Sequence, residues 1–142
     1  MKVFLIAAMS ADGFIARNSS HLASWTSKED KQFFIEKTKE AGVVVMGLNT
    51  YKTIGRPLPG RLNIVYSKTE KNIPGGAQIY TMFMEADLVN TVYLTMEPVF
   101  FGLGMGLFTK KLGRKLELEK THMLNKNSIV LQYKVLNDKT LL

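Results

Sequence analysis

The chain contains no cysteine, which excludes disulfide bridges, thiolate metal sites and thiol nucleophiles together. It also lacks any apolar run near the roughly 18 residues that a membrane-spanning helix needs. The segment Met1 to Met9 holds one lysine and passes directly into polar residues, unlike a secretory signal. We therefore expect a cytoplasmic protein that does not enter a membrane.

Acidic residues are scarce. The chain has 12 Asp and Glu against 19 Lys and Arg, a formal net charge of +7 and a pI near 9.6. Such a balance favours anionic partners. The basic residues are spread along the chain, densest at residues 110–115, and no nucleic-acid motif is present. We therefore expect a phosphate-bearing small ligand and no nucleic acid. The histidines, His21 and His122, are isolated, so no metal site is expected.

The length of 142 residues, with 46% hydrophobic content, suits a single domain over residues 1–142. Apolar runs bounded by turn residues predict strands, and helical periodicity predicts helices. The order of these elements predicts an α/β fold, with a mainly parallel twisted sheet, flanking helices and an antiparallel C-terminal hairpin. The predicted strands are 3–9, 43–46, 62–67, 91–96, 116–124 and 128–136; the predicted helices are 27–41, 49–54 and 75–86. Residues 10–26 are predicted to form a long functional loop.

One connection is too short for this fold. Only residues 68–74 separate the third strand from the next helix, and a crossover between parallel strands needs at least about 10–12 residues. Either a segment near residues 68–75 is missing from the printed sequence, or the chain is a natural or engineered deletion. We favour the missing segment.

Residues Ile54 to Asn63 read Ile-Gly-Arg-Pro-Leu-Pro-Gly-Arg-Leu-Asn. This run resembles the segment that joins the second and third strands of dihydrofolate reductases. Further stretches resemble the same family, namely Leu5–Met9, Trp25 with Asp30, Val45–Gly47 with Thr50, Gly75–Gly76 with Tyr80, and Tyr93–Thr95. The resemblance implies an NADPH-dependent reductase that converts dihydrofolate to tetrahydrofolate, as a monomer or homodimer.

The second half also resembles another branch of this superfamily, the riboflavin-pathway reductases, in the stretches 75–80, 93–99, 101–104 and 107–108. This leaves a second substrate open, the pyrimidine 5-amino-6-(5-phosphoribosylamino)uracil. A third hypothesis is a non-catalytic ligand-binding or assembly module on the same fold. It is favoured by the short connection and by Leu48, which stands where the family usually has an arginine for cofactor phosphate.

Asp30 is the candidate proton-handling group, because a carboxylate in an apolar pocket can hydrogen-bond an amino-pyrimidine and favour its protonation. The alternative is structural: the run Ser27 to Asp30 is like a capping box, in which Asp30 only satisfies a helix N-terminus. The family resemblance adds Trp25 and Thr95 to the catalytic set.

The resemblance also assigns binding residues. The substrate would contact Ala8, Phe34, Ile54 and Arg61, with Arg61 meeting an anionic tail. The cofactor would contact Ala7, Ile15, Gly47, Thr50, Ser67, Lys68, Gly75, Gly76, Ala77, Gln78, Ile79 and Tyr80. Gly47 and Thr50 would allow phosphate to approach the amides at a helix N-terminus.

Overall fold

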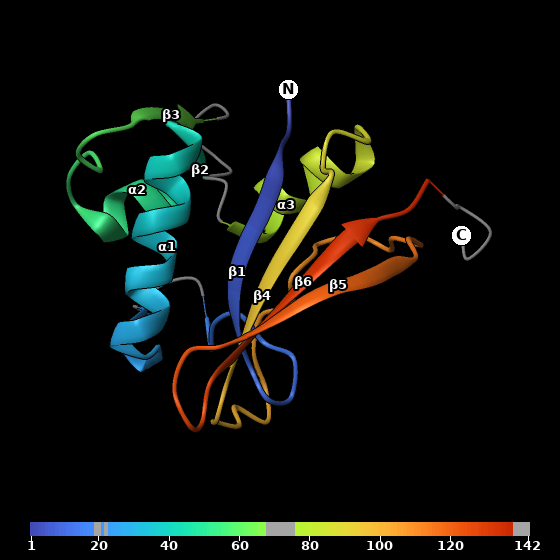
Figure 1. The fold of residues 1–142 in the computed structure, drawn as a ribbon. Coiled ribbons are helices and arrows are strands. Elements are labelled where there is room, and N and C mark those ends of the chain that lie inside the picture. The colour runs from blue at the N-terminus through green and yellow to red at the C-terminus, as the bar shows by residue number, and fades with distance from the viewer. Residues whose placement is uncertain (19–20, 22, 68–75, 138–142) are drawn as a thin grey trace.

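The computed structural model describes residues 1–18, 21, 23–67 and 76–137 (Figure 1). Its elements in chain order are β1 (Phe4–Ser10), η1 (Ala23–Trp25), α1 (Lys28–Ala41), β2 (Val43–Gly47), α2 (Leu48–Ile54), β3 (Leu62–Tyr66), α3 (Gly76–Glu85), β4 (Thr91–Glu97), β5 (Leu116–Met123) and β6 (Ile129–Val135). The predicted α/β class is confirmed, and each predicted strand and helix is present. The short 3-10 helix η1 lies inside the predicted loop and was not foreseen.

The strands form two separate sheets. The larger has the order β1-β4-β6-β5, in which β1 and β4 are parallel while β6 is antiparallel to both of its neighbours. This confirms the C-terminal hairpin. The smaller sheet is the parallel pair β2-β3. The expected continuous sheet is therefore divided, because β1 and β2 have no strand between them among the described residues.

This division changes the problem posed by the short connection. The strand β3 is not a neighbour of β4, nor does it belong to the same sheet. The whole connection from β3 to β4 runs over residues 67–90 and contains α3, so it is longer than the about 10–12 residues that a crossover needs. Residues 68–75 themselves lie outside the described part of the chain.

Helix α1 joins the two sheets. It begins at Ser27, whose Oγ accepts a hydrogen bond from the Asp30 backbone N–H, and it ends at Gly42 in the left-handed conformation (φ 76°). Its Phe33 packs edge-on against Tyr93 of β4, with ring centroids 5.7 Å apart. The helix thus covers the face of the larger sheet that carries Tyr93.

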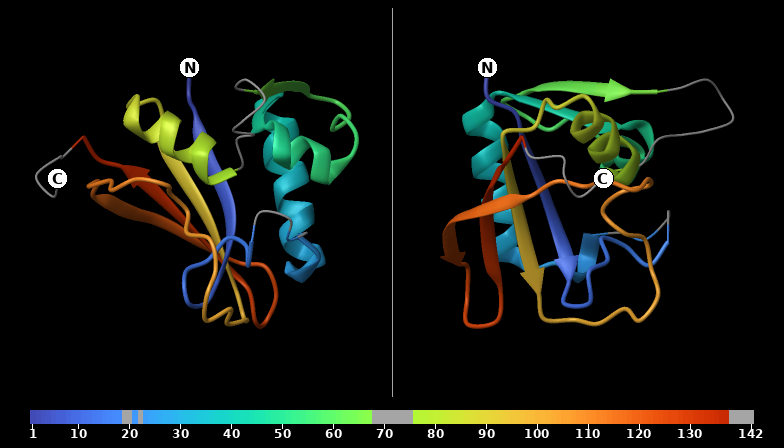
Figure 2. Two further views of the ribbon diagram at one scale, coloured as in Figure 1. Left: turned by 180° about the vertical axis from the view of Figure 1, so that it is seen from behind. Right: turned by 90° about the vertical axis from the view of Figure 1, so that its right-hand side faces the viewer.

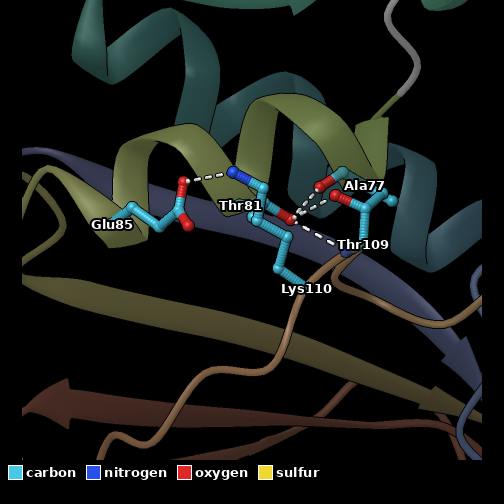
Figure 3. Close-up of polar contacts among 5 residues, drawn as sticks. All are labelled: Ala77, Thr81, Glu85, Thr109 and Lys110. Carbon is cyan, nitrogen blue, oxygen red and sulfur yellow. Dashed lines mark hydrogen bonds and ion pairs between the residues drawn. The ribbon is translucent and has the colours of Figure 1, made fainter.

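Helix α3 covers the opposite face of β1, as the right-hand view of Figure 2 shows. Its Met84 is buried with Leu5 of β1 and Val92 of β4, and these residues form the centre of the core. Figure 3 shows how α3 holds the segment after β4: the buried Thr81 Oγ1 accepts a hydrogen bond from the Thr109 N–H at 2.9 Å. No helix in the described ranges is long and apolar enough to cross a membrane.

Candidate functional site

A cavity of about 420 Å³ lies between β1 and β2, with α1 on one side and α3 on the other. Seven of the predicted site residues line it. From α1, α2 and the end of β2 come Phe34, Thr50, Ile54 and Gly47, and from α3 come Gly76, Ile79 and Tyr80. The structure thus brings substrate-side and cofactor-side candidates to one cavity.

The Asp30 carboxyl lies in the first turn of α1, half-buried, and is hydrogen-bonded to Thr95. Thr95 is 1% exposed on β4. Burial raises the pKa of Asp30 above its ordinary value; the Thr95 hydrogen bond opposes this rise, and the charge of Glu97 adds to it. Asp30 and Thr95, both members of the predicted catalytic set, are therefore in contact, and burial favours the protonated carboxyl more than it would in an exposed aspartate.

The capping-box alternative is correct for the helix backbone and wrong for the Asp30 side chain. In a capping box the third helical residue would accept a hydrogen bond from the Ser27 N–H. That N–H donates instead to Glu97 Oε2 at 2.9 Å, and the Ser27 hydroxyl lies 3.1 Å from Glu97 Oε1. Because Glu97 takes this role, the Asp30 carboxyl remains available to Thr95.

Tyr80 links the cavity to β1. Its hydroxyl donates a hydrogen bond to the Ile6 carbonyl at 3.0 Å. Burial, with a smaller contribution from the charge of Asp30, raises the pKa of Tyr80 to about 12. The phenol therefore stays protonated and acts as a fixed donor at the boundary of the site.

The residues that were missed at the sequence level include Ile6 and Glu97. The Ile6 carbonyl is a backbone group, which leaves no signal in the side-chain pattern. Glu97 does leave a signal in the sequence, because it is a lone acidic residue at the end of the apolar strand β4. In the structure its side chain is only 3% exposed. A charge buried this deeply needs partners, and Ser27 supplies two of them.

Trp25, predicted for the catalytic set, belongs to an aromatic group and is not among the residues that line the cavity. Its ring stacks with His21 at 6.3 Å and meets Phe101 edge-on at 5.0 Å, while the Arg17 guanidinium lies over Phe101. The predicted cofactor residue Ile15 is in the same region, where its N–H donates to the Met105 carbonyl at 2.8 Å. These residues fasten the loop after β1 to the loop after β4.

The guanidinium of Arg61 donates to Thr38 Oγ1 at 2.7 Å and to the Pro59 carbonyl at 2.9 Å. Thr38 lines the cavity. Arg61 is half-buried and is not itself among the residues that line the cavity; it contacts the wall only through Thr38.

The other predicted binding residues lie on β1, on α3 and after β3. Ala7 and Ala8 lie on β1, paired with Leu94 and Thr95 of β4. In α3, Ala77 is buried and Gln78 is exposed, whereas Ser67 is exposed after β3. Lys68 and Gly75 lie outside the described residues.

Leu48 opens α2 directly after the buried Gly47, and no side chain caps the start of this helix. The amides there are the groups that phosphate would meet. Across the described ranges, no group of three His, Asp or Glu side chains is placed to hold a metal ion.

Comparison with known proteins is consistent with this geometry. A family model described as "Dihydrofolate reductase" matches residues 2–126. Dihydrofolate reductase type A13 of Escherichia coli is 34% identical over 83 residues, which is 58% of this chain and 48% of that protein. The chain thus spans about half the length of that relative.

Two solved structures show the same fold. Dihydrofolate reductase from Enterococcus faecalis, in complex with NADP(H) and the compound RAB-propyl, superposes with a TM-score of 0.66 at 21% identity, covering 96% of this chain and 97% of that one. RibD of Acinetobacter baumannii superposes with a TM-score of 0.75 at 14% identity, covering 96% of this chain and 58% of that one.

Proposed function

Because the chain belongs to the dihydrofolate reductase family, we propose that it catalyses the NADPH-dependent reduction of dihydrofolate to tetrahydrofolate. The observation that carries this proposal is the contact between Asp30 and Thr95, with the charge of Asp30 acting on Tyr80, which lines the cavity together with Phe34 and Ile54. Asp30 and Thr95 are not themselves among the residues that line the cavity. The reaction consumes one hydride and one proton, and NADPH supplies the hydride when bound.

Asp30 handles the proton. Its pKa is raised, mainly by burial, so the carboxyl can hold a proton at a higher pH than an exposed aspartate. Such a carboxyl can donate to a ring nitrogen of a pterin when it is protonated, and it can accept from an exocyclic amino group when it is ionised. Thr95 fixes the carboxyl by a hydrogen bond, which limits the orientations that it can take.

The residues present fit the cofactor. The start of α2 offers amides without a side-chain cap beside the buried Gly47, and Thr50 lines the cavity one turn further on. These groups would hold a phosphate of NADPH. Gly76 and Tyr80 line the cavity from α3 and would meet the nicotinamide side. Leu48 offers no charge to the phosphate, so the affinity for NADPH rests on the backbone and on other residues.

Arg61 is assigned to the acidic tail of the substrate. A guanidinium has five N–H donors, and the structure engages it with Thr38 and the Pro59 carbonyl. The first of these bonds ties the side chain to Thr38 of α1, which lines the cavity. A bound carboxylate would accept from the same planar group.

The test is the loss of NADPH absorbance with dihydrofolate as the acceptor. We expect turnover that falls steeply in Asp30→Asn, whereas Glu29→Gln, a change of the neighbouring carboxylate, retains it. Parallel assays with 5-amino-6-(5-phosphoribosylamino)uracil examine the riboflavin-pathway alternative. Turnover on that pyrimidine alone would replace dihydrofolate as the substrate, and no turnover on either would favour a non-catalytic module.

A further inference from the structure

Glu97 is a charged residue in an apolar place. It ends β4, whose sequence Thr-Val-Tyr-Leu-Thr-Met-Glu carries no other charge, and its side chain is only 3% exposed. The β1 residue in register with it is Ser10, which is uncharged and buried. Within the described ranges Glu97 forms no ion pair. Because no cation neutralises it there, an ionised carboxylate at this place acts strongly on its neighbours.

The partner of the Glu97 carboxyl is Ser27, the residue that caps α1. The Ser27 N–H donates to Oε2 at 2.9 Å and the Ser27 hydroxyl donates to Oε1 at 3.1 Å. The same hydroxyl accepts from the Asp30 N–H at 3.1 Å. Both oxygens of Glu97 therefore accept, which is what an ionised carboxylate does. The first turn of α1 is thus fastened to the end of β4.

This fastening is one of three contacts that run in a line between α1 and β4. From the start of the helix onward, they join Ser27 to Glu97, Asp30 to Thr95, and Phe33 to Tyr93. The helix-side residues are three positions apart, so they share one side of the helix, and the strand-side residues are two positions apart, so they share one face of the strand. The contact of Asp30 with Thr95 is therefore bracketed at both ends, and Glu97 supplies the end at which the helix begins.

Glu97 also acts on Asp30 by its charge. Burial is the main cause that raises the pKa of Asp30, and the charge of Glu97 raises it further, whereas the Thr95 hydrogen bond and the charge of Lys31 lower it. From α3, the Tyr80 phenol feels the charge of Asp30 and stays protonated, with a pKa of about 12. Burial and Glu97 thus act in the same direction and favour the protonated carboxyl of Asp30.

We propose that Glu97 is a positioning residue for Asp30: it holds the first turn of α1 on the end of β4 through Ser27, and its negative charge keeps the shared proton on Asp30. Two carboxyl groups in one region then have different roles, because their surroundings differ. Asp30 carries the proton, and Glu97 orients and biases it. The kinetic consequence rests on the proposed function, but the place of the proton can be tested without turnover.

NMR titration of the side-chain carboxyl carbons measures ionisation in the full chain without substrate. The resonance that is lost in Asp30→Asn identifies Asp30. In Glu97→Gln, which keeps one acceptor for Ser27 and loses the charge, the titration midpoint of Asp30 should move to lower pH. Glu117→Gln, the same change at an exposed position of β5, should leave the midpoint unchanged. An unmoved midpoint in Glu97→Gln would overturn the proposal.

Ser27→Ala tests the anchor separately from the charge. It removes the hydroxyl that joins the Asp30 N–H to Glu97, and it keeps the backbone N–H bond and the charge of Glu97. The midpoint of Asp30 should therefore move less than in Glu97→Gln, while kcat on dihydrofolate falls by roughly tenfold with a nearly unchanged KM for NADPH. A merely structural role would lower the melting temperature in both variants and would move neither the midpoint nor kcat. That result would also overturn the proposal.

The unaltered chain decides the question if Glu97→Gln does not fold. Once its carboxyl resonance is assigned through the backbone, Glu97 should be ionised over the whole pH range in which Asp30 titrates. If Glu97 takes up the proton before Asp30 as the pH falls, the two roles are reversed and the proposal is wrong. Absence of turnover together with the expected midpoint shift would contradict the proposed function and would still support the assignment of Glu97.

Discussion

The substitution Asp30→Asn separates the two roles that this residue could have. The helix cap is made by Ser27 Oγ and the Asp30 backbone N–H at 3.1 Å, and asparagine retains that N–H. A cap is worth about 1 kcal/mol, and none of it should be lost. The carboxyl that contacts Thr95 is removed as a proton carrier. Because general acid–base groups contribute about 10²–10⁴-fold, turnover on dihydrofolate should fall by that factor.

The difference in melting temperature between Asp30→Asn and the wild type should depend on pH. Burial raises the pKa of Asp30 in the folded state, so folding favours the protonated carboxyl. This contribution is fully present below the ordinary value of 3.8 and is lost as the pH rises through the higher folded-state pKa. Asparagine does not titrate. The melting temperature of the variant should therefore gain on the wild type as the pH rises across that window.

Steady-state assays and thermal melts from about pH 4 to 8, which start near the ordinary aspartate pKa and run upward, measure both effects. Glu29→Gln is the matched control. The reasoning would be refuted by near-normal turnover in Asp30→Asn. A pH-independent drop in melting temperature of about 3–4 °C, the equivalent of about 1 kcal/mol in a chain of this size, would also refute it, since it would mean that the side chain only supports the helix.

Three further substitutions test other contacts. Glu97→Gln removes the charge that helps to raise the pKa of Asp30, and it removes one acceptor for Ser27. The part of the pH profile that depends on protonated Asp30 should therefore move to lower pH, and the free energy of unfolding should fall by about 1–3 kcal/mol. An unshifted pH profile would contradict this. Gly104→Ala would place a Cβ 2.5 Å from the Ala16 carbonyl oxygen and should lower the free energy of unfolding, measured by chemical denaturation, by about 1–3 kcal/mol. Gly106→Ala is the control, because a Cβ there would have no neighbour nearer than 3.9 Å. Equal losses of stability in the two variants would contradict the close approach at Gly104. Leu48→Arg should tighten NADPH binding by about three- to tenfold at low salt and leave the affinity for dihydrofolate unchanged. Titration calorimetry measures both affinities. An unchanged NADPH affinity would mean that another basic residue already contacts the phosphate.

Much of the fold could be predicted because its signals are local. The uncharged runs at β1 and β2 define strands, and the capping residues Ser27 and Gly42 bound α1 within one residue of the prediction. Asp30 and Thr95 were both placed in the catalytic set through the family resemblance and not through spacing, and the structure shows that they are in contact. These features depend on a few neighbouring residues or on a motif that survives intact.

Only the tertiary structure decided the remainder, because it depends on contacts between distant residues. Ser27 and Glu97 are 70 positions apart, so the sequence could not show that Glu97 would take the Ser27 N–H and free the Asp30 carboxyl. The same holds for the place of β1 in the sheet. Apolar patterning predicts that β1 is a buried strand, since it records which faces prefer burial and not which strand lies alongside. Among the described residues, β1 lies at the edge of the larger sheet, where it lines the cavity.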